Sequence, residues 1–228
     1  HFPFEPMYQT RIPRKMLWRT GRQVAKSSNA AARGIVLSAI MPHLSTLCVT
    51  PLFEQIRRFS TQYVRPFIDQ SPVKALLADT TTENSVLQKS FVNRSKMFFS
   101  FAYLDADRLR GISADVLAAD EIQDIDISLL PIIAETLSAS KYRFQLFTGT
   151  PKTLDNTIEG LWNQSSRAEW VIDCSACKKQ NVPRLGYDLE RMIGPSHPGI
   201  GPLQPAPGSK QVAGTPAIVC AKCGHWLD

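Results

Sequence analysis

The sequence predicts an α/β fold in which helices flank a mostly parallel sheet, followed by a small cysteine-bearing element. Two observations carry this prediction. Short apolar segments of strand length alternate with helical patterns along most of the chain, and after Pro151 the composition shifts toward paired cysteines, proline and glycine. Strands that alternate with helices favour parallel pairing through right-handed crossovers. The 228 residues suffice for one sizeable domain and an appendage.

The first elements are read from apolar patterning. A strand is expected at residues 15–19, and the following segment 26–41, rich in Ala, Ile, Val and Leu, predicts a helix. Residues 45–50 read as a strand that ends at Pro51, since proline cannot continue a central strand. Apolar residues at intervals of three or four predict a helix over 53–67, with this face: Phe53, Ile56, Phe59, Tyr63 and Phe67.

The alternation continues through the next hundred residues. The expected elements are strands at 86–92 and 97–103 around a turn at 93–96, a buried strand at 115–119, a helix at 128–137, a strand at 142–148 and a helix at 153–162. We place a domain boundary near residue 165, which gives a first domain of residues 1–165 and a second of 166–228. Within the second, the Pro/Gly-rich stretch 194–209 cannot hold a helix or a central strand.

Composition narrows the class of protein. Hydrophobic residues make up 43% and charged residues 20%, as in soluble globular proteins. No apolar run approaches the roughly 18–20 residues that span a membrane, so no membrane association is expected. The start of the chain lacks the order of a signal peptide and lacks Met, which predicts a non-secreted protein cut from a longer chain. The net charge of +6 permits a polyanionic partner without identifying one.

Residues 20–27 (TGRQVAKS) follow a strand and open a helix, which is the context of a phosphate-binding loop. In such a loop Lys26 binds the β- and γ-phosphates and Ser27 binds Mg²⁺. Thr20 stands where the first glycine belongs, and Ala25 replaces the glycine before the lysine, at a position that often needs φ > 0. The alternative is a basic loop whose helix is capped by a serine. The predicted nucleotide-binding set is Gly21, Arg22, Gln23, Val24, Ala25, Lys26, Ser27 and Ser28.

Two further patterns follow in an order that fits nucleotide hydrolysis. The buried strand at 115–119 leads directly into Asp120 and Glu121; in an NTPase the Asp holds Mg²⁺ and the Glu orients and deprotonates the attacking water. The alternative is a pair of solvated acids at a strand end. The strand at 142–148 ends in Thr148-Gly149-Thr150-Pro151, a small polar turn whose hydroxyls can sense the γ-phosphate.

Taken in order, these motifs resemble those of the large terminases of tailed phages. Residues 22–27 are similar to the family's S-R-Q-x-G-K-[ST] loop, with Gly21 and Ala25 in place of its Ser and Gly. Residues 109–115 (LRGISAD) resemble its R-G-x-x-x-D stretch before the Walker B strand, and 148–151 match its coupling motif. Thr50-Pro51 resembles a further motif after the second strand. The resemblance covers about residues 8–165.

The resemblance implies a RecA-like (ASCE) P-loop NTPase that uses ATP and Mg²⁺ to pump double-stranded DNA into a procapsid. It implies a homo-oligomeric ring on the portal, a small terminase subunit as partner and a place in the host cell cytoplasm. It assigns Arg22, with Lys26, Asp120 and Glu121, to catalysis; Arg22 acts on the γ-phosphate of its own subunit. Candidates for an arginine acting on a neighbouring subunit are Arg108 and Arg110, and candidates for adenine contact are Tyr8 and Gln9. The family's nuclease domain has no counterpart in these residues.

Four of the five cysteines form two Cys-x-x-Cys pairs, Cys174 with Cys177 and Cys220 with Cys223. Each pair presents two thiolates to one tetrahedral ion, so together they predict a Cys₄ zinc site of the ribbon type with a structural role. Redox motifs or disulfides are the alternative, which a reducing compartment disfavours. A zinc ribbon after the motor motifs also resembles the lambda-like branch of the terminases.

Two other functions remain open. A superfamily 2 helicase or translocase needs a second RecA-like domain, and residues 166–228 are too few and too rich in cysteine to form one. A non-hydrolysing P-loop fold carrying a zinc-ribbon nucleic-acid-binding module is favoured by Thr20 and Ala25. The intact set of Lys26, Ser27, Asp120 and Glu121 argues against it.

Overall fold

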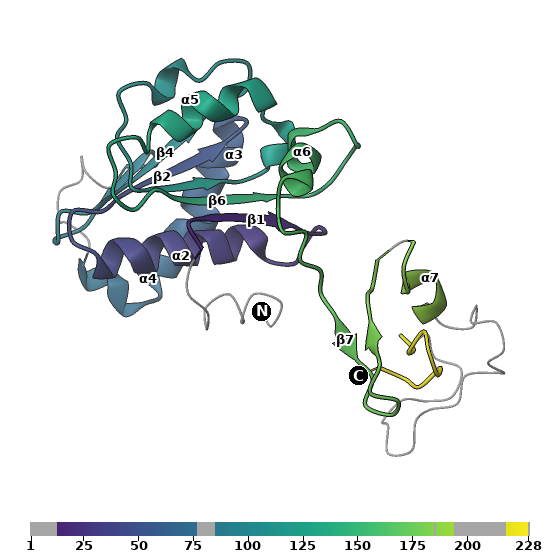
Figure 1. Ribbon diagram of the computed structural model, residues 1–228. Helices are drawn as coiled ribbons and strands as arrows, with labels where there is room; N and C mark the ends of the chain where they lie inside the picture. Colours follow the sequence, from purple (N-terminus) through teal and green to yellow (C-terminus); the bar gives the residue numbers. More distant parts are fainter. Residues whose placement is uncertain (1–12, 77–84, 185, 194–217, 228) are drawn as a thin grey trace. The chain divides into compact units, whose positions relative to one another are not determined.

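The computed structural model describes residues 13–76, 85–184, 186–193 and 218–227 (Figure 1). The chain divides into two compact units, His1–Ser166 and Arg167–Asp228, which are described separately below. Among the described residues, no helix is both long and apolar enough to cross a lipid bilayer.

The first unit is built on a six-stranded sheet with the order β1-β6-β5-β2-β4-β3. All neighbouring strands are parallel except β3, which pairs antiparallel with β4 at the edge. The strands are β1 (Lys15–Arg19), β2 (Ser45–Thr50), β3 (Gln88–Ser90), β4 (Lys96–Phe101), β5 (Val116–Ala119) and β6 (Phe144–Gly149). The predicted α/β class with a mostly parallel sheet is confirmed.

Helices cover both faces of this sheet (Figure 1). On one face lie α2 (Lys26–Ile40), α3 (Phe53–Arg58) and α4 (Arg65–Asp69); on the other lie α5 (Leu130–Glu135) and α6 (Thr157–Asn163). The strand β5 shows why both faces must be covered, since all four of its residues are buried. Leu117 and Ala119 pack into the core under α5 and α6, whereas Ala118 packs into the core under α2.

The prediction of one continuous helix over 53–67 was wrong in its interior. A π-helical segment, Phe59–Val64, separates α3 from α4. The wider turn rotates the residues that follow, so Val64 and Ile68 face the core while Tyr63 and Phe67 are exposed. A spacing of three or four residues cannot reveal such an insertion, because it assumes an unbroken α-helical period.

Other predicted elements exist with shifted bounds. The helix expected at 128–137 is a 3₁₀ turn, Ile127–Leu129, followed by α5. The helix expected at 153–162 starts only at Thr157. Its N-terminus is capped by the Asn156 side chain, which accepts a hydrogen bond from Glu159 N at 3.1 Å. The strand expected at 86–92 is confined to β3, and the strand expected at 97–103 is β4.

The described residues of the second unit contain little regular structure. A two-stranded antiparallel ribbon joins β7 (Ile172–Asp173) to β8 (Gln180–Asn181), and one short helix, α7 (Leu189–Met192), follows. Isolated bridges pair Ile193 with Ile218 and Val219 with Trp226. The predicted Pro/Gly-rich loop at 194–209 lies outside the described residues.

Candidate nucleotide and metal sites

The sheet order brings three loops together at one edge. Strands β1, β6 and β5 are parallel neighbours, so their carboxyl ends meet on the same side of the sheet. The loop 20–25 follows β1, Asp120 and Glu121 follow β5, and Thr150 follows β6. In open α/β sheets this edge is where ligands bind. Segments separated by about a hundred residues in the sequence are thus placed around one site by topology alone.

The loop after β1 is tightly turned before α2 begins. Thr20 N donates a hydrogen bond to Gly149 O at 3.2 Å, which ties the loop to the end of β6. Gln23 has a φ of 61° and Ala25 a φ of 63°, so both lie in the left-handed region. Ala25 therefore adopts the backbone conformation for which the glycine of a phosphate loop is suited, and it bears the steric cost of its methyl group.

The N-terminus of α2, the helix that follows, favours the binding of an anion. The first backbone N–H groups of α2 have no partner within the helix, and its dipole is positive at this end. No acidic residue lies in its first turn, so no side chain of the helix competes with a bound phosphate there. The 15-residue length of α2 gives this terminus the dipole of a full helix.

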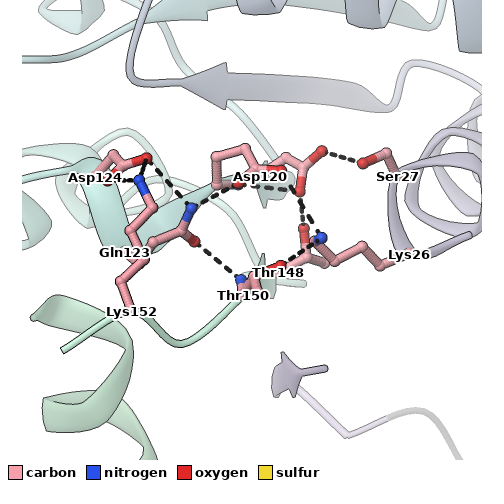
Figure 2. A network of polar contacts seen from close by, with 9 residues as sticks. Lys26, Ser27, Asp120, Gln123, Asp124, Thr148, Thr150 and Lys152 are labelled. Atoms are coloured by element: carbon pink, nitrogen blue, oxygen red, sulfur yellow. Dashed lines mark hydrogen bonds and ion pairs between the residues drawn. The ribbon is translucent and has the colours of Figure 1, made fainter. Parts of the chain in front are cut away.

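Lys26 and Ser27, the first residues of α2, reach the loops after the neighbouring strands (Figure 2). The Lys26 Nζ donates to Thr150 Oγ1 at 2.9 Å and lies 3.8 Å from Glu121 Oε1. The Ser27 Oγ donates to Asp120 Oδ2 at 2.5 Å. The hydroxyl and the carboxylate are hard oxygen ligands of the kind that Mg²⁺ prefers, and their closeness allows both to bind one cation.

Asp120 is the most deeply buried acid of the site, with 7% of its surface exposed. Burial raises the pKa of its carboxyl, while hydrogen bonds from Ser27 and Thr148 act in the opposite direction. The Thr148 hydroxyl donates to Asp120 Oδ1, and Glu121 N donates to the same oxygen at 3.0 Å. A buried carboxylate held by neutral donors is costly without a positive charge, which favours a cation beside it.

The polar network continues beyond Asp120. The side chain of Gln123 donates from Nε2 to Glu121 Oε2 at 2.6 Å and accepts from Thr150 N at 3.1 Å through its Oε1 (Figure 2). Asp124 accepts from Lys152 Nζ at 2.7 Å. The turn after β6 is therefore joined to the residues after β5 by side chains from both segments.

These residues surround an open cavity of about 630 Å³. Its volume falls in the range of small-molecule and cofactor sites. The lining residues are Arg22, Gln23, Ala25, Lys26, Ser27, Ser28, Gln55, Tyr63, Glu121, Gln123, Asp124, Thr150, Pro151 and Lys152.

Eight of the sequence-predicted site residues line this cavity: Arg22, Gln23, Ala25, Lys26, Ser27, Ser28, Glu121 and Thr150. Gly21, Val24 and Gly149 do not line it; Asp120 and Thr148 do not either, but they are joined to Ser27 through the hydrogen bonds of Asp120. Arg108 lies over the ring of Phe101 and Arg110 pairs with Asp107 at 3.0 Å; neither lines the cavity. Tyr8 and Gln9 lie outside the described residues.

Sequence reasoning missed several residues of the cavity wall. Gln55 comes from α3 and Tyr63 from the π-helical segment; the sequence predicted Tyr63 only as part of a helical face and singled out Gln55 for no role. Gln123 and Lys152 carry no motif of their own, although each lies within two residues of one that was recognised. The signal that could have found them is this proximity to the motifs at the ends of β5 and β6.

In the second unit the four paired cysteines converge. Their four Sγ atoms all lie within 4.8 Å of one another, with Cys174 to Cys223 and Cys177 to Cys220 each at 3.7 Å. Four thiolates at about 2.3 Å from a tetrahedral zinc ion would lie about 3.8 Å apart. The cysteine geometry therefore fits Zn²⁺. Cys48 is not part of this group; it is buried in β2 of the first unit.

The two cysteine pairs sit in equivalent turns. In the first, Lys178 N donates to Cys174 O at 2.9 Å; in the second, Gly224 N donates to Cys220 O at 2.8 Å. The residues Lys178 and Gly224 both have left-handed backbones, with φ of 58° and 75°. The buried Asn181 joins the halves, because its Oδ1 accepts from Ala221 N at 2.8 Å. Two matched knuckles that present thiols to one centre are the arrangement of a zinc ribbon.

The crowded thiols differ in acidity. Burial opposes ionisation of Cys220, but N–H groups of Lys222 and Cys223 outweigh it and lower the pKa of this thiol to about 6. Burial, together with the neighbouring cysteines, raises the pKa of Cys223 to about 12. Cys220 thus forms a thiolate readily, and a bound divalent cation would favour the thiolate of Cys223.

A known protein family matches nearly the whole sequence. The sequence model of the family described as "Phage terminase large subunit gpA, ATPase domain" matches residues 5–228. A comparison with curated proteins gives no significant match.

Solved structures share the fold. The large terminase ATPase domain of Thermus phage P74-26 is 20% identical, with a TM-score of 0.55 over 68% of this chain and 66% of that one. The large terminase of bacteriophage HK97 is 9% identical, with a TM-score of 0.55 over 66% of this chain and 32% of that one. A large terminase from a thermophilic bacteriophage is 9% identical, with a TM-score of 0.53 over 69% of this chain and 40% of that one. The chain thus spans about one third to two thirds of the length of these proteins.

The family match covers nearly the whole chain, and the sheet carries the loop 20–25, the acidic pair Asp120-Glu121 and the threonine-containing turn at one edge. The fold of the solved terminases agrees with this assignment. The chain therefore belongs to the family of phage terminase large subunit ATPase domains typified by gpA.

Proposed function

We propose that this chain hydrolyses ATP at the carboxyl edge of the sheet and that hydrolysis drives double-stranded DNA into a procapsid. The observation that carries the proposal is that Lys26, Ser27 and Glu121 line one open cavity, and that Ser27 donates a hydrogen bond to the buried Asp120 behind it. The ATPase family to which the chain belongs supports the nucleotide and the activity.

The loop and the start of α2 hold the triphosphate. The backbone N–H groups of residues 21–28 and the helix dipole attract the phosphates, and Lys26 binds the β- and γ-phosphates. Ser27 and Asp120 would hold the magnesium ion, which when bound offsets the negative charge of the β- and γ-oxygens.

Glu121 acts on the attacking water. It accepts a proton from the water as the oxygen attacks the γ-phosphorus and the bond from that phosphorus to the β,γ-bridging oxygen breaks. The products are ADP and inorganic phosphate. The exposed Arg22 lies on the cavity wall and acts on the γ-phosphate in cis, while Thr148 and Thr150 respond to its presence. Arg108 or Arg110, on an exposed turn away from the cavity, serves a neighbouring subunit.

The motor works with partners that the family resemblance implies: double-stranded DNA, the portal and procapsid, and a small terminase subunit. We place its action in the host cytoplasm, in a ring of identical chains. The net charge of +6 suits a DNA partner. We assign residues 1–165 to the ATPase domain and 166–228 to a subdomain that Zn²⁺ stabilises through the four cysteines. With all four positions filled by thiolates the zinc has no open site, so its role is structural.

The activity is tested by measuring ATP hydrolysis with and without linear double-stranded DNA, in the wild type and in Lys26→Ala and Glu121→Gln. Each substitution should lower turnover by about 100-fold or more, since one loses a charged phosphate contact and the other the base. Gln88→Met, on the edge strand β3, is a control that should hydrolyse ATP at the wild-type rate. Wild-type rates in both site variants would contradict the proposal.

A further inference from the structure

A buried glutamine links the two halves of the site. Gln123 lies in the 3₁₀ turn Ile122–Asp124, directly after Glu121, and 6% of its surface is exposed. Its amide group contacts the chain in two directions: toward the carboxylates after β5 and toward the backbone after β6 (Figure 2).

Every polar atom of this amide has a partner. Nε2 donates to Glu121 Oε2 at 2.6 Å and to Asp124 Oδ2 at 3.3 Å, and Oε1 accepts from Thr150 N at 3.1 Å. Among side chains of this length only an amide supplies two donors and an acceptor together. Glutamate would lose the donors, and methionine would lose all three contacts. The contacts therefore fix both the identity and the orientation of the side chain.

The two carboxylate oxygens of Glu121 have different partners. Oε2 is tied to Gln123, while Oε1 faces Lys26 Nζ at 3.8 Å on the cavity side. The backbone of Glu121 lies in the left-handed region, with a φ of 55°, which is costly for a residue with a side chain and is found where surrounding contacts over-determine a functional position. Gln123 supplies one of those contacts.

The turn after β6 is shaped to receive the glutamine. A Cβ atom at Gly149 would lie 2.4 Å from Gln123 Oε1 and 2.9 Å from Ile158 Cδ1. The absence of a side chain at Gly149 is thus what allows the amide to reach Thr150 N. The same Thr150 accepts from Lys26 through its hydroxyl, so one residue of the turn contacts both the phosphate-binding lysine and the glutamine.

We propose that Gln123 is a positioning residue that holds Glu121 in its water-activating orientation and joins it to the turn 148–151. A displacement of Thr150 is then transmitted to the catalytic carboxylate through one rigid amide. This rests on the proposed function, in which Glu121 is the base and the turn responds to the γ-phosphate.

The test compares Gln123→Met with the wild type in single-turnover ATP hydrolysis and in equilibrium binding of ATP. The expected result is a rate about 10- to 100-fold lower with binding changed less than about threefold, because the phosphate ligands are untouched. Gln123→Glu keeps the length and the acceptor for Thr150 N but loses the donor, and it should lower the rate by at least as much. The matched control Gln88→Met also removes a side-chain hydrogen bond, from Gln88 to Ser90, and should leave the rate unchanged.

Two further measurements separate positioning from general damage. In the Glu121→Gln background, Gln123→Met should lower the residual rate no further, since the residue it positions is already gone. Amide exchange at Thr150, followed by NMR without nucleotide, should accelerate about tenfold or more in Gln123→Met. Full activity in Gln123→Met, an equal loss in the Glu121→Gln background, or unchanged exchange at Thr150 would each overturn the inference. Failure of the proposed function shows differently, as wild-type hydrolysis in Lys26→Ala and Glu121→Gln.

Discussion

Replacing Gly149 by alanine tests how tightly the turn after β6 is packed. The added Cβ would meet Gln123 Oε1 at 2.4 Å, Ile158 Cδ1 at 2.9 Å and Ile122 Cγ2 at 3.2 Å. The backbone is not the obstacle, because Gly149 is not among the residues with positive φ. The methyl group therefore acts by crowding alone, and Gln123 has to give way.

The loss of stability is the sum of the effects on Gln123, on the neighbouring isoleucines and on the unfolded chain. Withdrawing the amide from Thr150 N forfeits about 1 kcal/mol, and overpacking against the isoleucines adds about 1–3 kcal/mol. The reduced entropy of the unfolded chain returns roughly 0.4–1 kcal/mol. Gly149→Ala should thus lower the free energy of unfolding by about 1–3 kcal/mol. Urea unfolding followed by far-UV circular dichroism measures this, because most of the helical residues that the structure describes belong to the first unit.

Two controls make the result specific. At Gly21 a Cβ would meet nothing within 4 Å, so Gly21→Ala should change stability by less than about 0.5 kcal/mol. In a Gln123→Ala background the amide is absent, and Gly149→Ala should cost at least about 1 kcal/mol less than in the wild type. If Gly149→Ala is as stable as the wild type, or costs the same in both backgrounds, the described packing of this turn is refuted.

Three other outcomes are expected. Ala25→Gly should raise the free energy of unfolding by up to about 1 kcal/mol in the same urea assay. The relief of about 1–2 kcal/mol of left-handed backbone strain exceeds the entropy that glycine adds to the unfolded chain. A loss of stability would contradict this. Elemental analysis should find about one zinc per chain. Cys174→Ser should abolish zinc binding while ATP binding by the first unit persists. Zinc retained in that variant would exclude the four-cysteine site. Burial raises the pKa of Cys48 to about 12, so this thiol stays protonated as the pH rises toward 10. In zinc-free folded protein, mass spectrometry should therefore find iodoacetamide on no more than four of the five cysteines. Modification of Cys48 below pH 10 would contradict its burial.

The sequence predicted best the short strands that end at a clear loop or proline. The strands at 15–19 and 45–50 have the predicted bounds, because each is a short apolar run that leads into a loop or a proline. The interior of the segment 53–67 could not be predicted, since the π-helical insertion depends on how Val64 and Ile68 pack under the sheet. Local spacing contains no information about that packing.

The site residues divide likewise into those that a local motif identifies and those that depend on tertiary structure. Lys26, Ser27, Asp120 and Glu121 were found because their chemistry recurs at fixed places in strand–loop–helix units. Gln123, Gln55 and Tyr63 were missed because their approach to the cavity depends on the sheet order β1-β6-β5-β2 and on the π-helical turn. In the second unit Gly224 and Lys178 have equivalent left-handed backbones, and at Lys178 no glycine marks that conformation in the sequence.

The most direct test of the account is a crystal structure of the chain with a non-hydrolysable ATP analogue and Mg²⁺. The account predicts the triphosphate on the loop 20–25, its γ-phosphate at Lys26 Nζ, and a metal ion between Ser27 and Asp120 with Glu121 facing the γ-phosphate. A nucleotide bound elsewhere, or bound here with Asp120 and Glu121 turned away from its phosphates, would contradict it.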